Sequence, residues 1–171
     1  MHALPVEYVL STTDLPWGEV ALAVDSGWLP MTAARQLADV RRLDEDPVHS
    51  LIWDLAGVRA DEPARALLGR IAEREPPTDQ AIVRGRWLAL YLLELTDHPR
   101  PDPLPILEDI WHEFGHPSEL NRFIRYMPAE HSELVQKRSI EENLSAMRQS
   151  WLDWARLTRP TWLAQVAPAS A

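Results

Sequence analysis

The chain has 171 residues, of which 46% are hydrophobic, and it contains no cysteine. This size and apolar content predict one globular domain, and the missing thiols exclude disulfides and thiolate metal sites. Acidic residues number 26 against 17 basic ones, which gives a formal net charge of −9. That balance disfavours a nucleic-acid partner and fits a basic protein partner, although acidity is also typical of proteins that simply stay soluble.

Neither the first residues nor any apolar run predicts a membrane or secretion signal. The start, MHALPVEYVL, has no Lys or Arg before its apolar part and includes Glu7, so it is a poor signal peptide. The longest strongly apolar run, 87–93, is far too short to cross a bilayer. We therefore expect a cytoplasmic protein with no membrane partner.

The first helix is predicted between Asp14, which can serve as its N-cap, and about Asp25, with Gly27 past its end. Residues 5–10 before it fit either a short strand or the lead-in to a helix. The apolar side of the predicted helix repeats at helical spacing. It comprises Trp17, Val20, Ala21 and Val24.

Three more helices are predicted before residue 75. Thr32 is the expected cap of a helix that runs to about Leu43. Pro47 and Pro63 each suit the first position of a further helix, the earlier one capped by Asp46. The residues expected to face inward are Ala33, Leu37, Val40, Val48, Leu51, Ile52, Leu55, Ala64, Leu67, Leu68 and Ile71.

The fifth predicted helix begins after Thr78 or Asp79 and runs to about Thr96. Its centre, 87–93, is apolar nearly all round, which predicts the most buried part of the chain. The segment 97–105 follows and holds four prolines. It is predicted to be a long surface loop or a seam between two halves.

Residues 104–128 predict two short amphipathic helices. The first carries Leu107, Ile110, Trp111 and Phe114 at helical spacing, and the second carries Leu120, Phe123, Ile124 and Met127. Ser139 and Glu142 then form a capping box for a last helix to about Leu157. Its expected stripe is Ile140, Leu144, Met147, Trp151 and Trp154, and a tail docked by Trp162 is expected to fray from about 163.

No stretch alternates apolar and polar residues long enough to predict a strand. The expected fold is therefore all-α, with about eight short helices packed as a bundle in one domain that spans residues 1–171. An irregular α-solenoid is the second choice, since helices of similar length recur between prolines.

The string His112-Glu113-x-x-His116 matches the zinc-hydrolase motif HExxH. That chemistry needs both histidines on one face of a helix, Glu113 as the general base and a third protein ligand. A zinc-dependent hydrolase is therefore an alternative for this chain.

Two features weigh against that alternative. Gly115 and Pro117 are predicted to end the helix, which places His116 at or beyond its last turn, opposite the apolar stripe. The third ligand is missing at the usual spacing, although Glu133 or Glu142 could supply one. We predict no metal, no cofactor and no catalytic residue.

Surface residues around the third predicted helix are the candidates for partner binding. Trp53 lies beside the apolar face of that helix and next to Asp54. Aromatic residues with carboxylates around them can form a protein-binding patch. The predicted patch consists of Asp44, Glu45, Asp46, Trp53 and Asp54.

Several packing motifs stand in a characteristic order along the chain: Trp17, Gly27-Trp28, Trp87, 114–117 and Tyr126-Met127-Pro128. Over about residues 14–157 this order resembles a family of small bacterial all-helical domains of unknown function, similar to the immunity proteins of polymorphic toxin systems. The resemblance implies a non-enzymatic protein that binds and neutralises a cognate basic toxin domain, and it implies no metal at His112 and His116. A helical adaptor domain is a further alternative, and the sequence predicts no oligomeric state.

Overall fold

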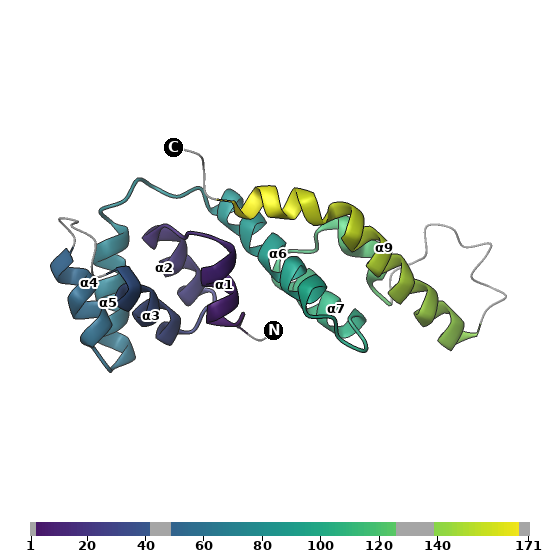
Figure 1. Cartoon of the computed structure of the whole chain (residues 1–171), viewed down its shortest axis with the longest axis horizontal. Coiled ribbons are helices and arrows are strands. Elements are labelled where there is room, and N and C mark those ends of the chain that lie inside the picture. Colours follow the sequence, from purple (N-terminus) through teal and green to yellow (C-terminus); the bar gives the residue numbers. More distant parts are fainter. Residues whose placement is uncertain (1–2, 42–48, 126–138, 168–171) are drawn as a thin grey trace. The chain divides into compact units, whose positions relative to one another are not determined.

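The computed structural model describes residues 3–41, 49–125 and 139–167, and Figure 1 follows them through the chain. These ranges contain eight α-helices, one 3-10 helix and no strand, which confirms the all-α prediction. The elements are α1 (Val6–Thr12), α2 (Trp17–Asp25), α3 (Met31–Arg41), α4 (His49–Gly57), α5 (Asp61–Ala72), α6 (Gln80–Asp97), α7 (Leu104–Glu113), η1 (Ser118–Phe123) and α9 (Ile140–Val166). None of the described helices is both long and apolar enough to span a membrane.

Contacts divide the chain into two compact units. One unit, here the N-terminal unit, comprises residues 2–87 with 166–171, and the other, the C-terminal unit, comprises 88–165 with residue 1. The division falls inside α6 and not in the proline-rich segment 97–105. Since α6 and α9 each continue through the division as one helix, a single domain stays our prediction.

In the N-terminal unit, α3 packs against α4 and α5, and α2 packs against α5. The predicted caps of α2 and α3 are wrong. Helix α2 starts after Pro16 and α3 starts after Pro30, so Asp14 lies too early and Thr32 lies inside a helix. Proline before each helix sets the entering backbone, and α2 has no side-chain cap.

The inward faces of these helices follow the predicted spacing with few exceptions. The prediction that Val40 faces inward is wrong, because 67% of this residue is exposed at the end of α3. Helix α5 begins two residues before Pro63, and Leu67 is only half-buried. The other predicted inward residues of α3, α4 and α5 are buried: Ala33, Leu37, Leu51, Ile52, Leu55, Ala64, Leu68 and Ile71. The predicted Asp46 cap, Pro47 start and Val48 contact lie outside the described residues.

Helix α6 begins as its sequence predicts. Oδ1 of Asp79 accepts a hydrogen bond from the backbone N–H of Ala81 at 2.8 Å, which satisfies a donor of the first turn. The buried centre is also confirmed: of residues 87–93, all but Leu88 are buried. Trp28 packs against Trp87 in the N-terminal unit, with ring centroids 5.8 Å apart.

In the C-terminal unit, the predicted pair of short helices is α7 and η1, the second of which is a 3-10 helix. Burial of Leu107, Ile110, Trp111, Leu120, Phe123 and Ile124 confirms their apolar stripes, whereas Phe114 is half-buried. Met127 lies outside the described residues.

Helix α9 begins with the predicted capping box. The N–H of Ser139 donates to Glu142 at 2.7 Å, and the N–H of Glu142 donates to the Ser139 hydroxyl at 3.2 Å. The prediction that Ile140 belongs to the buried apolar face of this helix is wrong, since 81% of it is exposed. Trp151, predicted on the same face, is buried.

The predicted end of the last helix at Leu157 and the frayed tail from about 163 are wrong. Helix α9 continues through Pro160 to Val166. Proline removes one helical hydrogen bond and crowds the carbonyl four residues earlier. Trp162 and Val166 are both buried beyond it, and this burial offsets the cost of the proline.

Candidate functional site

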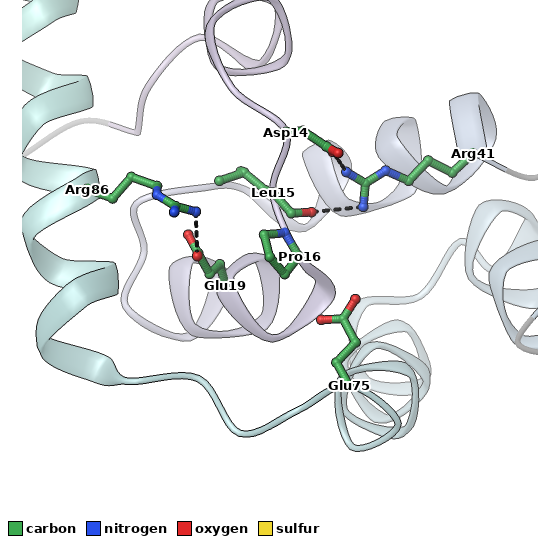
Figure 2. A pocket seen from close by; sticks show the side chains of 7 residues that line it. All are labelled: Asp14, Leu15, Pro16, Glu19, Arg41, Glu75 and Arg86. Carbon is green, nitrogen blue, oxygen red and sulfur yellow. Dashed lines mark hydrogen bonds and ion pairs between the residues drawn. The ribbon is translucent and has the colours of Figure 1, made fainter. Parts of the chain in front are cut away.

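A charged pocket of about 380 Å³ lies within the N-terminal unit, and Figure 2 shows its lining. Its residues come from the α1–α2 connection, α2, α3, the segment after α5, and α6. They are Asp14, Leu15, Pro16, Glu19, Arg41, Glu75 and Arg86. None of these was predicted as a site residue.

A buried ion pair between α2 and α6 forms one wall of the pocket. Arg86 donates to Glu19 Oε1 at 2.6 Å, and only 5% of the Glu19 side chain is exposed. Burial raises the pKa of Glu19 above its usual range, although the Arg86 charge acts against this, and the nearby Glu75 carboxylate adds to the rise. Oε2 of Glu19 is buried and accepts no hydrogen bond from the described residues.

Arg41 and Glu75 line other parts of the pocket. Arg41 donates to the Leu15 carbonyl at 2.8 Å, pairs with Asp14, and lies over the Trp17 ring. Glu75 accepts from the backbone N–H of Gly18 at 2.8 Å. Both arginines are thus paired within the pocket, and three carboxylates face two guanidinium groups. The pocket therefore offers carboxylate oxygens to a cationic group.

One sequence signal could have found this pocket. Glu19 stands between Trp17 and Val20 on a short helix, at a position that the fold buries. An ionisable residue on such a face needs a partner. Its partner, Arg86, is 67 residues away in the chain, and sequence spacing alone does not identify it.

The predicted end of the helix at the HExxH string is confirmed. Helix α7 ends at Glu113, Gly115 has φ 77°, and His116 has φ 64°. The backbone N–H of His116 donates to the Trp111 carbonyl at 2.8 Å and turns the chain back on the helix. Both histidines are exposed, as predicted.

This turn still brings the two imidazoles together. His112 Nδ1 and His116 Nε2 are 3.4 Å apart, and the His116 ring lies over Trp111 with centroids 4.0 Å apart. Within the described ranges no group of three or more acidic, histidine or cysteine side chains could hold a metal ion. Among the described residues, His112 and His116 thus lie side by side, and no third side chain that could ligate a metal joins them.

The predicted partner-binding patch is described only in part. On α4, Trp53 is 45% exposed and Asp54 is exposed, while neighbouring Leu51 and Leu55 turn inward. An exposed tryptophan beside a carboxylate is compatible with a protein-binding surface. The patch itself stays a prediction. The acidic run Asp44, Glu45 and Asp46 lies outside the described residues.

Helices throughout the described ranges place the chain in the class of small all-α proteins. Residues 6–157 match the family model described as "Uncharacterized protein conserved in bacteria (DUF2247)". The chain belongs to this bacterial family, which confirms the resemblance to small bacterial domains of unknown function. No curated protein and no solved structure matches the chain.

Proposed function

We propose that this chain is a cytoplasmic, non-enzymatic immunity-type protein that binds and neutralises a cognate basic toxin domain. The observation that carries the proposal is the net charge of −9 on a small helical protein of a bacterial family. A strong negative field accelerates encounter with a basic protein and disfavours acidic partners. The order of packing motifs in the sequence, which resembles that of immunity proteins, points to the same choice.

Helix α4 supplies the surface that we assign to the partner. Trp53 is a large exposed side chain that a partner could bury, and aromatic residues of this kind often dominate binding free energy. Asp54 places a carboxylate next to it. Helix α4 is anchored through Leu51, Ile52 and Leu55, so the surface is presented on a packed element.

The charged pocket supports a basic partner as well. Its arginines are already paired with Glu19 and Asp14, so a further ligand meets a surplus carboxylate at Glu75. A lysine or arginine side chain is the complementary group. The hydrolase alternative has no comparable support, because α7 ends before His116 and no third ligand accompanies the pair in the described ranges.

The decisive experiment is co-expression with any basic toxin-like domain that is found encoded next to this gene, followed by calorimetry of the purified pair. We expect protection of the cells and a 1:1 complex. Trp53→Ala is expected to weaken binding by roughly tenfold or more, the effect typical of an aromatic interface anchor. Ile82→Ala is the matched control, because Ile82 is 63% exposed on α6 of the same unit.

If the cells are not protected and no complex forms, the immunity proposal is wrong. Binding without protection would instead favour a helical adaptor. Binding that Trp53→Ala leaves unchanged would leave the proposal standing but move the interface away from α4.

A further inference from the structure

The two imidazoles at the end of α7 form an arrangement that the proposed function does not use. His112 is the penultimate residue of α7, and His116 lies beyond its end, yet Nδ1 of the first and Nε2 of the second are 3.4 Å apart. Their ring planes are inclined by 75°, with centroids 5.4 Å apart. Two ring nitrogens therefore face one another at the surface.

This separation matches the spacing of two nitrogens that ligate one tetrahedral ion. Zinc binds imidazole nitrogen at about 2.0–2.1 Å. With bonds of that length, a nitrogen separation of 3.4 Å gives an N–Zn–N angle of roughly 110°, close to tetrahedral. An ion can thus take the place of the contact between the two ring nitrogens, with little movement of either ring.

The backbone and Trp111 hold the pair in place. Gly115 and His116 both have positive φ, and the His116 N–H donates to the Trp111 carbonyl at 2.8 Å. Positive φ is strained for a residue other than glycine, and such strain often marks a functional position. The Trp111 ring packs against the His116 imidazole, with ring centroids 4.0 Å apart. Pre-positioned ligands lose less conformational freedom when they bind an ion.

We propose that His112 and His116 form an open two-histidine site for a divalent late transition-metal ion such as Zn²⁺. Imidazole is a preferred ligand for Zn²⁺, Cu²⁺ and Ni²⁺. Glu108, one turn earlier, does not complete the site, since Arg125 binds both of its oxygens at 2.7 Å. The remaining coordination positions are filled by water, so the site binds metal without the constellation that HExxH hydrolysis requires.

Calorimetric titration of the full chain with ZnCl₂ tests the site. We expect one saturable site, reversed by EDTA. His116→Gly removes one ligand but keeps the turn, because glycine accepts φ 64° without strain. His112→Ala removes the other ligand from an exposed position. Each variant is expected to bind Zn²⁺ roughly tenfold or more weakly than the native chain.

His98→Ala is the matched control, because His98 is an exposed histidine at the end of α6 near Glu94. It is expected to leave the affinity unchanged, and circular dichroism checks that all three variants are folded. The proposal is overturned if Zn²⁺ fails to saturate a site, or if His98→Ala weakens binding as much as His112→Ala and His116→Gly do. This outcome is separate from toxin binding, which is expected to persist in all three variants.

Discussion

The Glu19–Arg86 pair is the residue-scale feature on which the N-terminal unit depends most. Both side chains are largely buried, with exposed fractions of 5% and 14%. Arg86→Met leaves the carboxylate buried without its partner and is expected to lower the free energy of unfolding by about 3 kcal/mol. Urea denaturation measures the loss. Arg65→Met is the control, since its pair with Asp25 is exposed and worth about 0.5 kcal/mol. Equal losses in the two variants would contradict the prediction.

The raised pKa of Glu19 predicts a pH dependence of stability. Between the unfolded and the folded pKa, the folded state binds more protons, so the contribution of Glu19 to stability falls as pH rises through this window. Glu19→Gln removes the ionisation. We therefore expect its stability relative to the native chain to increase from low to neutral pH, as measured by chemical denaturation at several pH values.

Asp102 should respond in the opposite sense. A hydrogen bond from Arg148 at 3.1 Å lowers the pKa of this carboxyl. Its stabilising contribution is therefore present above the unfolded pKa and is lost as pH falls through the folded one. Asp102→Asn is expected to lose stability relative to the native chain as pH rises. If Glu19→Gln and Asp102→Asn gave the same trend, the two assigned shifts would be wrong.

At the scale of the element, the end of α7 depends on two residues with positive φ. Gly115→Ala is expected to cost about 1 kcal/mol, because a side chain is strained at φ 77°. His116→Gly relieves the same kind of strain and is expected to raise the free energy of unfolding by a similar amount. Thermal unfolding of both variants measures the opposite signs. Nothing described lies within 4 Å of a Cβ added at Gly115, so a loss there reports backbone strain and not a clash.

Helix α9 contains a proline whose cost can be measured. Pro160→Ala restores a backbone donor and removes the crowding of the preceding turn, so a gain of roughly 1–3 kcal/mol is expected. Ser139→Ala removes the side-chain half of the capping box and is expected to lose about 1 kcal/mol. Chemical denaturation compares the two. A loss on Pro160→Ala would mean that the proline ring makes packing contacts that outweigh the missing hydrogen bond.

For the whole molecule, the net charge of −9 predicts how the proposed complex forms. Added salt screens the attraction between an acidic protein and a basic partner, so the association rate should fall by roughly tenfold between low and high ionic strength. The dissociation rate should change much less, since close contacts are screened less. Stopped-flow measurements at several salt concentrations separate the two rates. A salt-independent association rate would remove electrostatic steering from the proposal.

The sequence by itself determined the features that depend on neighbouring residues. Helical spacing predicted the helices, Thr78 or Asp79 predicted the start of α6, and Gly115 predicted the end of α7. The capping box at Ser139 and the buried centre of α6 follow from the same local chemistry. These features were predictable because a helix forms and ends through contacts within a few residues of each other.

Only the tertiary structure decided features that join distant residues or set local preference aside. Glu19 and Arg86 meet across 67 positions, and Trp162 and Val166 are buried beyond Leu157, where the last helix was predicted to end. The His112–His116 pair depends on a backbone reversal that the motif does not encode in its spacing. In α9 burial outweighs local propensity, because the free energy gained from packing Trp162 and Val166 exceeds the cost of the proline. The other two features depend on which distant or reversed segments the chain brings together, and local propensity does not determine that.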